Sequence, residues 1–371
     1  MEKSTNIIKD RLACIDVLRG FNMFFLVGAA EVIRRFIRGF DTDALDFIYR
    51  QLNHVEWEGF VAWDLIMPLF LFTSGLSMPY SFGKLFDKGY SKAKIYVKVL
   101  KRFCILFLLG WIVAGNLLDL NIATFHIYTN TLQSIAFGYL LTALIVLNIK
   151  NISGQLAAGI SMVVVYWALM AFAPVPGIGS GVLTPDGNFA LYIDKIILGS
   201  LMSPKSDYTW IISSLGFGAT VFSGYYAGML LKEKTNENQK LIKMTLIGVG
   251  LIVAGLLLSL HQPIIKKLWT SSMVLLSSGW SFLLLALTFF ITDKMRIDCW
   301  WTRGFRMFGL NAITSYMLWQ IFNLKGLSEY WTHGLEQYTG TFYPFFVALG
   351  TFGIIYFIIR HLYKYKIFIK V

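Results

Sequence analysis

Hydrophobic residues in this chain gather in long runs separated by short polar segments. Ten of these runs have a length of about 18 to 25 residues, enough for an α-helix to cross a bilayer. They lie at residues 14–33, 61–80, 97–117, 130–149, 155–173, 208–231, 241–260, 270–292, 305–323 and 343–361. The pattern predicts an all-α, polytopic integral membrane protein with about ten transmembrane helices. Residues 189–201 belong to the loop between the fifth and sixth runs and could lie along the membrane surface as a short amphipathic helix.

Basic residues are distributed unevenly between the loops that these runs define. With a cytoplasmic N-terminus, 23 of the 33 Lys and Arg residues fall on the cytoplasmic side and 9 on the other. Cytoplasmic loops of membrane proteins carry such an excess, so both termini are predicted to be cytoplasmic. The richest loop, residues 84–102, is typical of a solvated face near lipid headgroups and could also collect a polyanionic cofactor.

Composition supports this class and excludes others. Hydrophobic residues make up 56% of the chain and charged residues only 15%, against about 25% charged in a typical globular domain. Soluble α/β enzymes, nucleic-acid-binding modules and disordered proteins are therefore excluded. The chain shows no long linker or low-complexity tract, so residues 1–371 are predicted to form a single transmembrane domain. Its five His and three Cys lack zinc-ligand spacing, and no metal site is expected.

The densest polar cluster precedes and opens the second run. His54 lies just before this run, and Asp64 lies about one helical turn inside it. A neutral imidazole held by a carboxylate is the usual way to form a general base or nucleophile near neutral pH. The same residues could equally serve as a headgroup anchor and a helix cap. Their spacing leaves both interpretations open.

Two further groups of charges lie within the first run, where an ionisable residue needs a partner or a role. Asp16 and Arg19 are three residues apart on one helix face. They form either a buried ion pair or an anion site in which Arg19 receives a phosphate. Glu31, near the other end of this run, could reach the neighbourhood of the His/Asp pair or could instead pair with Arg34 or Arg35.

Amide side chains recur in later runs. Asn116, Gln133 and Asn311 are examples; they either hold helices together by hydrogen bonds or line a polar cavity that crosses much of the bilayer. A polar pathway with a His/Asp pair outside and an Arg inside fits a transporter. It fits equally well an enzyme that moves a group across the membrane.

Several short motifs carry a resemblance that covers the whole chain. They read R-L-A-C-I-D-V-L-R-G at 11–20, H-V-E-W-E-G at 54–59, D-L-I-M-P-L-F-L-F-T-S-G at 64–75, N-T-L-Q-S-I at 130–135, K-L-W-T-S-S at 267–272, G-L-N-A at 309–312 and K-I-F at 366–368. In this order they resemble the heparan-α-glucosaminide N-acetyltransferase family. The chain is similar to the short bacterial branch, which lacks the family's large luminal N-terminal domain.

The resemblance implies a transmembrane acyltransferase, which uses acetyl-CoA from the cytoplasm and acetylates the amine of a terminal glucosaminide on the far side. It implies that His54 is the catalytic residue and Asp64 its helper. Arg19 and Arg102 are expected to bind the nucleotide end of acetyl-CoA, and Gln133 and Asn311 to line its pathway. The resemblance further implies a homodimer, and we expect it in a bacterial cytoplasmic (inner) membrane, with lipid but no nucleic acid as a partner.

Some positions depart from the family pattern, and two alternatives stay open. Ser134 stands where the family has a basic residue, residues 28–31 lack the family's Asn, and Trp319-Gln320 replaces a His-Glu pair, so the acceptor could be another amino sugar. The imidazole could form an acetyl intermediate or act as a base in direct transfer. The alternative function is an amino-sugar transporter or permease with the His/Asp pair as proton carriers, although no inverted repeat supports it.

Overall fold

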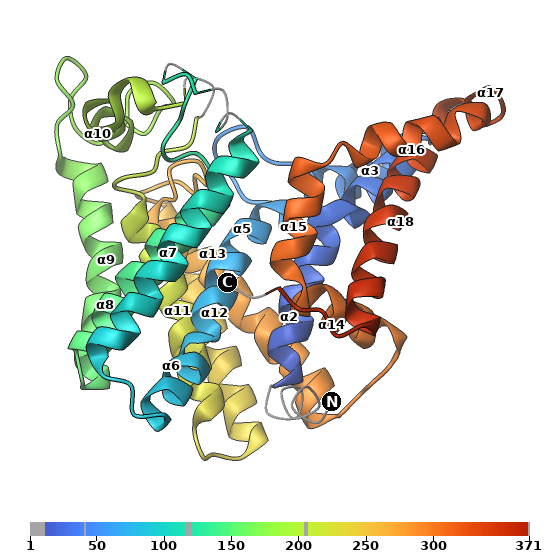
Figure 1. Ribbon diagram of the computed structural model, residues 1–371. Helices are drawn as coiled ribbons and strands as arrows, with labels where there is room; N and C mark the ends of the chain where they lie inside the picture. Colours follow the sequence, from blue (N-terminus) through green and yellow to red (C-terminus); the bar gives the residue numbers. More distant parts are fainter. Residues whose placement is uncertain are drawn as a thin grey trace. The chain divides into compact units, whose positions relative to one another are not determined.

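A computed structural model describes residues 12–40, 42–115, 117, 120–122, 124–203 and 207–369 (Figure 1). Arg11, the first residue of the R-L-A-C-I-D-V-L-R-G motif, and Asn116, one of the amides in the predicted runs, lie outside these residues. In the described part of the chain, seven helices are long and apolar enough to cross a membrane, namely Ala13–Arg38, Ala62–Asp87, Thr131–Asn148, Ile152–Phe172, Glu237–Ser259, Ser271–Lys294 and Leu324–Lys364. The prediction of an all-α chain with several apolar spans is confirmed. The count of ten and the cytoplasmic termini stay predictions.

The other three predicted runs are also helical. Two of them form α7 (Lys92–Ala114) and α11 (Ser214–Lys232). The ninth run differs from the prediction, because it is divided into α14 (Trp300–Leu310) and α15 (Ala312–Ile321), which meet at Asn311.

The break has a local cause. Asn311 has φ −117° and ψ 31°, and its carbonyl accepts hydrogen bonds from the backbone N–H and the hydroxyl of Ser315. Asn residues favour such caps over the interior of a helix. An apolar run shows where a span lies but does not reveal this interruption.

The chain divides into two compact units. Unit 1 takes the described residues of Met1–His54, Val61–Ile66 and Leu287–Val371, and unit 2 takes Val55–Phe60 and Met67–Ala286. The expectation of a single domain stays a prediction.

In unit 1, α2 (Ala13–Phe24) packs along α14 at very short range. A Cβ atom at Gly20 would lie 1.6 Å from the carbonyl oxygen of Phe305, and one at Gly309 would lie 1.9 Å from the carbonyl oxygen of Asp16. Small residues permit such backbone contact between helices in a membrane. The two glycines therefore set the crossing of α2 and α14.

The first apolar run of unit 1 bends at Gly28. This residue has φ +146° inside the irregular turn Phe25–Ala29, which separates α2 from α3 (Ala30–Arg38). The described remainder of the unit includes short helices and the last long helix, which packs against α3. These are α4 (Asp46–Gln51), α16 (Leu324–Thr332), α17 (Glu336–Thr339) and α18 (Tyr343–Lys364). The bend gives α3 a direction of its own and carries its charged residues toward the loop that precedes His54.

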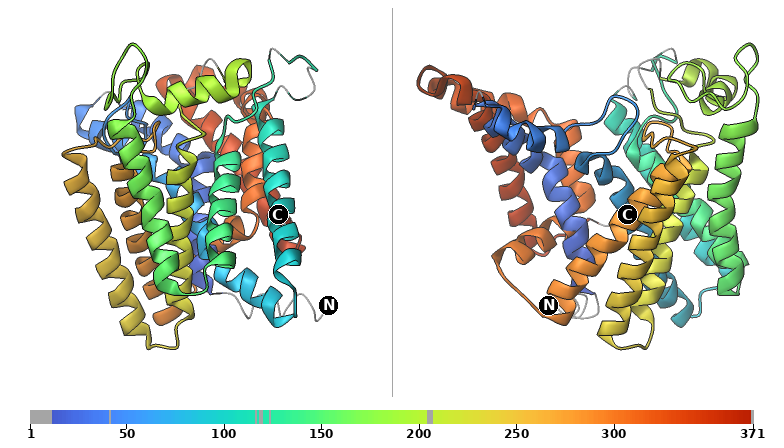
Figure 2. Two further views of the ribbon diagram at one scale, coloured as in Figure 1. Left: turned by 90° about the vertical axis from the view of Figure 1, so that its left-hand side faces the viewer. Right: turned by 180° about the vertical axis from the view of Figure 1, so that it is seen from behind.

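Unit 2 is built around α11. The long helices α7, α8, α9 and α11 run beside one another in it (Figure 2). Carbonyl oxygens of Phe72 and Leu76 approach Gly224 and Gly228 of α11 so closely that a Cβ would lie 1.9 Å and 2.5 Å from them. The other described helices of the unit are α5 (Ile66–Leu76), α6 (Met78–Asp87), α8 (Thr131–Asn148), α9 (Ile152–Phe172), α10 (Phe189–Leu198), α12 (Glu237–Ser259) and α13 (Ser271–Phe289), of which α5 begins and α13 ends in unit 1.

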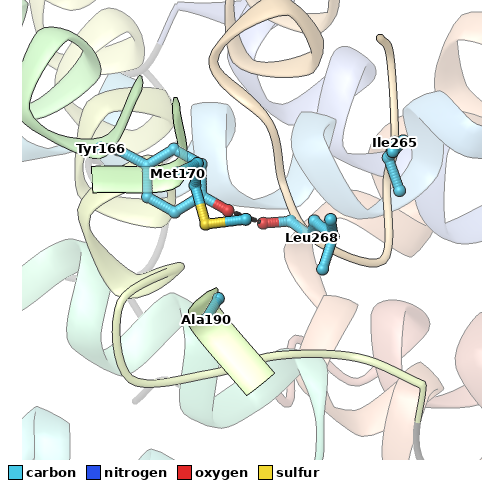
Figure 3. Packing of buried hydrophobic residues seen from close by; sticks show 5 residues of the cluster. All are labelled: Tyr166, Met170, Ala190, Ile265 and Leu268. Atoms are coloured by element: carbon cyan, nitrogen blue, oxygen red, sulfur yellow. Dashed lines mark hydrogen bonds between the residues drawn. The ribbon is translucent and has the colours of Figure 1, made fainter. Parts of the chain in front are cut away.

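The predicted amphipathic helix at residues 189–201 is present as α10 followed by a short 3-10 turn. One end of α10 packs on a buried apolar cluster of unit 2 (Figure 3). The cluster comprises Tyr166, Met170, Ala190, Ile265 and Leu268. Within it, the Tyr166 hydroxyl donates a hydrogen bond to the carbonyl of Leu268.

Candidate active site

The structure of unit 1 brings His54 and Asp64 together. His54 follows α4 by a few residues, and Asp64 lies in the 3-10 turn Ala62–Leu65 that leads into α5. The Nδ1 atom of His54 is 2.7 Å from Oδ1 of Asp64. The second carboxylate oxygen, Oδ2, accepts a hydrogen bond of 3.3 Å from the backbone N–H of Val61. The carboxylate is therefore held in place by its own turn while it contacts the imidazole.

Burial differs sharply between the two partners. The Asp64 side chain is 1% exposed, whereas the His54 side chain is 49% exposed. A buried carboxylate that accepts the Nδ1–H of an imidazole favours the tautomer with its lone pair on Nε2 and stabilises the ring when it gains a proton. The pair thus combines a fixed, buried acceptor with a ring that solutes can reach.

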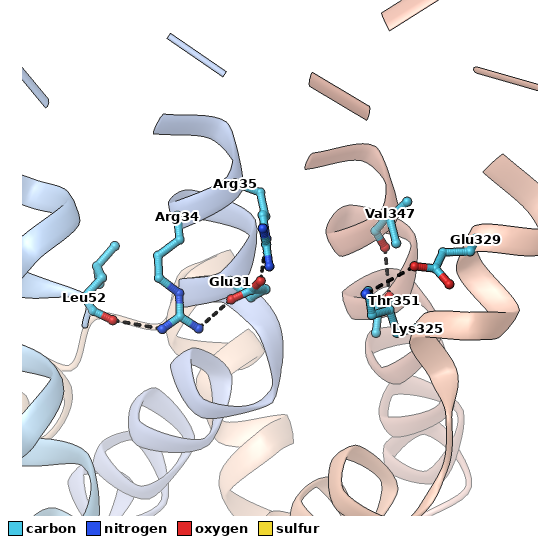
Figure 4. A network of polar contacts seen from close by, with 8 residues as sticks. All are labelled: Glu31, Arg34, Arg35, Leu52, Lys325, Glu329, Val347 and Thr351. Carbon is cyan, nitrogen blue, oxygen red and sulfur yellow. Dashed lines mark hydrogen bonds and ion pairs between the residues drawn. The ribbon is translucent and has the colours of Figure 1, made fainter. Parts of the chain in front are cut away.

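Glu31 is engaged with the two arginines that follow it on α3. Its Oε2 is 2.5 Å from a terminal nitrogen of Arg34, and its Oε1 is 2.7 Å from Nε of Arg35 (Figure 4). Of the two possibilities that the sequence left open, the structure has the ion pair. Arg34 also donates a 3.0 Å hydrogen bond to the carbonyl of Leu52.

The remainder of the H-x-x-W-x-G motif belongs to unit 2, where it is anchored to other loops. The indole N–H of Trp57 donates to the carbonyl of Leu183 at 2.9 Å, and its ring packs on the apolar cluster of Figure 3. Lys267 lies over the same ring, at 5.8 Å from its centroid. The backbone N–H of Gly59 donates to the carbonyl of Ile264 at 2.9 Å. In this motif Trp57 and Gly59 therefore hold the loop that follows His54.

Two of the residues predicted to bind cofactor lie in unit 1. Arg19 is 3.9 Å from Asp16, so the predicted ion pair is present. Asn311 is fully buried at the junction of α14 and α15, and neither its Oδ1 nor its Nδ2 has a hydrogen-bond partner among the described residues. A buried amide without hydrogen-bond partners lowers the stability of the fold unless another group supplies those hydrogen bonds.

The other two residues predicted to bind the cofactor or line its pathway, Arg102 and Gln133, lie in unit 2. Arg102 of α7 lies over the ring of Tyr139, at 4.2 Å from its centroid. Gln133 is fully buried; its Nε2 donates to the carbonyl of Ile127 and its Oε1 accepts from the N–H of Thr129, at 3.0 and 2.7 Å. These contacts make Gln133 a support for the segment before α8.

No cluster of three or more His, Cys, Asp or Glu side chains suited to a metal is found within the described residues. From the sequence, Arg34 is recognisable only as a partner of Glu31, and its contact with Leu52 is not. The charge spacing on α3 is visible in the sequence, but the path of the loop that brings Leu52 close is not.

Comparison with known proteins identifies relatives along most of the chain. No family model matches. The mouse heparan-α-glucosaminide N-acetyltransferase is 22% identical over a match that covers 83% of this chain and 53% of the mouse protein. For the human protein of the same name the identity is 24%, and the match covers 74% of this chain and 49% of the relative. The chain thus spans about half the length of these relatives. Over this stretch the chain shows distant, family-level homology to the heparan-α-glucosaminide N-acetyltransferases.

Proposed function

We propose that the protein is a membrane N-acetyltransferase, which moves the acetyl group of acetyl-CoA to the amine of an amino sugar. The observation that carries the proposal is the 2.7 Å contact between His54 Nδ1 and Asp64 Oδ1. It supports the proposal because the relatives of this chain are named for N-acetyl transfer to a glucosaminide. Acetyl-CoA is the acetyl donor in this proposal and enters as a substrate.

His54 acts as the general base. Its Nε2 takes a proton from the ammonium group of the acceptor, and Asp64 stabilises the resulting imidazolium. The amine nitrogen then attacks the thioester carbonyl; a C–N bond forms, the C–S bond breaks, and the departing CoA thiolate takes up the second proton that the nitrogen loses as it becomes an amide. The proton held by His54 is then released to solvent. We favour direct transfer over an acetyl-imidazole, because a ring that is 49% exposed would lose an acetyl group to water.

Cationic and amide side chains have assigned roles in the proposal. Arg19 and Arg102 are each candidates for the phosphates of CoA, since guanidinium groups bind phosphate with paired donors. Asn311 is a candidate for the acyl pathway, because its buried amide lacks a partner among the described residues. Gln133 contributes by supporting the segment before α8.

The enzyme is proposed to lie in a bacterial cytoplasmic membrane as a homodimer, with both termini in the cytoplasm. The excess of basic residues in alternate loops supports this orientation. In this topology the His54–Asp64 pair faces the periplasm, the side on which the proposal places the amino-sugar acceptor.

Transfer of labelled acetyl tests the proposal. Purified protein in detergent is incubated with labelled acetyl-CoA and glucosamine or a glucosaminide, and wild type is compared with His54→Ala. A matched control is His333→Ala, because His333 also lies in unit 1 beside a carboxylate, 3.7 Å from Glu336. We expect label on the amine for wild type and the control and none for His54→Ala. Sugar uptake by proteoliposomes without acetyl transfer would replace the enzyme with a transporter.

A further inference from the structure

Arg34 joins three separate segments of unit 1 through one guanidinium group. One terminal nitrogen is 2.5 Å from Glu31 on the same helix, and the other donates at 3.0 Å to the carbonyl of Leu52. The central carbon of the guanidinium, Cζ, lies over the ring of Trp63, 5.2 Å from its centroid. Figure 4 shows the first two of these contacts.

The two segments that Arg34 contacts are those that carry the proposed catalytic pair. Leu52 precedes His54 by two residues, and Trp63 is the direct neighbour of Asp64. The Trp63 ring also contacts the His54 ring, with centroids 6.2 Å apart. A single side chain on α3 therefore fixes the backbone before the imidazole and the ring beside the carboxylate.

The chemistry of this contact suits arginine. A guanidinium is planar and cationic, so it can donate in its own plane to a carboxylate and a carbonyl while its charge is attracted to a nearby indole ring. The Arg34 side chain is only 21% exposed, whereas Arg35, the other partner of Glu31, is 48% exposed. The contacts of a mostly buried side chain such as Arg34 are less screened by water and hold their geometry better than those of an exposed one.

We propose that Arg34 is a positioning residue for the acetyl transfer, which sets the relative placement of His54 and Asp64 by holding Leu52 and Trp63. The expected loss of kcat rests on the proposed function, whereas the expected change in the placement of His54 against Asp64 does not. Lysine could keep the charge opposite Glu31 but could not reproduce two donors held in fixed directions beside the ring of Trp63.

The experiment compares Arg34→Gln and Arg34→Lys with the matched control Arg35→Gln, which removes the other partner of Glu31. Folding is checked by thermal unfolding, and kcat and KM for acetyl-CoA are measured separately. We expect Arg34→Gln to lower kcat by about 100-fold with little change in KM, because small misplacements of reacting groups cost about this much. Arg34→Lys should recover little of the loss, and Arg35→Gln should behave as wild type.

A second readout needs no turnover. The chain has five His, so selective ¹⁵N-histidine labelling, with the His54→Ala spectrum as the assignment, gives the shifts of the two ring nitrogens of His54. These shifts report whether Nδ1 keeps its hydrogen bond to Asp64. We expect that Arg34→Gln changes them and that Arg35→Gln does not.

The outcomes separate the two proposals. If wild type shows no acetyl transfer that depends on His54, the proposed function fails, while the ring shifts still decide the positioning role. If Arg34→Gln keeps the kcat and the ring shifts of wild type, the positioning role is wrong. It is equally wrong if Arg35→Gln reproduces the losses of Arg34→Gln, since the Glu31 pair alone would then explain them. For a variant that does not fold, the conservative Arg34→Lys supplies the same two readouts.

Discussion

Gly309 of α14 lies directly against the backbone of Asp16 in α2, so that a methyl group on Gly309 would be 1.9 Å from the Asp16 carbonyl oxygen. The atom in the way belongs to the backbone and cannot rotate aside. The helices would have to separate, and the ion pair of Asp16 with Arg19 lies at this crossing.

Gly309→Ala is therefore expected to destabilise the protein. The free energy of unfolding should fall by about 1 to 3 kcal/mol or more, the usual cost of forcing atoms into a packed interface. Gly304→Ala is the control, because Gly304 lies in the same helix and, among the described residues, a methyl group there would meet nothing within 4 Å beyond its chain neighbours and its own helix backbone. At this position alanine should be neutral or stabilising by up to about 1 kcal/mol. Thermal unfolding in detergent checks both, and equal melting temperatures would contradict the prediction.

Asp64→Asn is expected to lower acetyl transfer while the fold is kept. An amide cannot stabilise an imidazolium as a carboxylate does, and it can offer its NH₂ group to Nδ1 and so favour the other tautomer. We expect a loss of about 10²- to 10⁴-fold in kcat, the range of general acid–base catalysis. Asp46→Asn serves as the control, since Asp46 pairs with Arg50 at the surface of the same unit, 4.0 Å away. A kcat of Asp64→Asn near that of wild type would count against a catalytic pair.

Asp194 gives unit 2 a pH-dependent stability. Its buried carboxylate accepts hydrogen bonds from the N–H groups of Trp210 and Ile211, at 2.7 and 2.9 Å. Burial raises its pKa to about 6, although these two hydrogen bonds oppose the shift. Because the pKa is higher in the folded state than in the unfolded state, the folded protein binds more protons between about pH 4 and 6. The contribution of the Asp194 carboxyl to the free energy of unfolding is complete at low pH and is lost as the pH rises through this window.

The measurement compares wild type with Asp194→Asn, which cannot titrate. Thermal unfolding at pH 4, 5, 6 and 7 should show wild type losing stability relative to the variant, by an amount on the order of 3 kcal/mol in all. The comparison cancels the other groups that titrate in this range. A stability difference that stays constant from pH 4 to 7 would refute the prediction.

Asn311→Leu separates stability from function. Both polar atoms of this buried amide lack hydrogen-bond partners among the described residues, and replacing it with an apolar side chain of similar size removes a desolvation cost of about 1 to 3 kcal/mol. We expect a higher melting temperature together with weaker acetyl transfer or a raised KM for acetyl-CoA. Unchanged kinetics would remove Asn311 from the proposed pathway.

The proposed orientation can be tested on two exposed loop residues. In a cysteine-free background, Lys88→Cys and Asp186→Cys place single thiols in loops predicted to lie on opposite sides of the membrane. A maleimide that cannot cross membranes should label Asp186→Cys in intact cells and Lys88→Cys only after permeabilisation. The reverse pattern would overturn the predicted topology.

The sequence predicted the helices well because a span must bury all its backbone hydrogen bonds in lipid, and this demand leaves a long apolar run. The approach of His54 to Asp64 was within reach of the sequence as one of two interpretations, since ten residues can fold a loop back over the start of a helix. The break at Asn311 could not be predicted from the sequence, because it depends on a single residue within an otherwise apolar run.

The supports of the proposed site were also hidden from the sequence. Trp57 bonds to Leu183, more than a hundred positions away, and Arg34 reaches Leu52 from another helix. Such contacts follow from the paths of loops, which the spacing of apolar residues does not determine.

The bend at Gly28 also changes how the first apolar run relates to the thickness of a bilayer. Its 26 residues, from Ala13 to Arg38, would measure about 39 Å as a straight helix at about 1.5 Å per residue, well beyond a hydrocarbon layer of about 30 Å. With the bend, α2 and the turn Phe25–Ala29 together extend about 26 Å at about 1.5 Å per residue, close to the thickness of the layer, and α3 can turn away from the membrane normal. Four of the nine residues of α3 are charged, and in a bilayer this change of direction would relieve the hydrophobic mismatch by letting them lie among lipid headgroups and water.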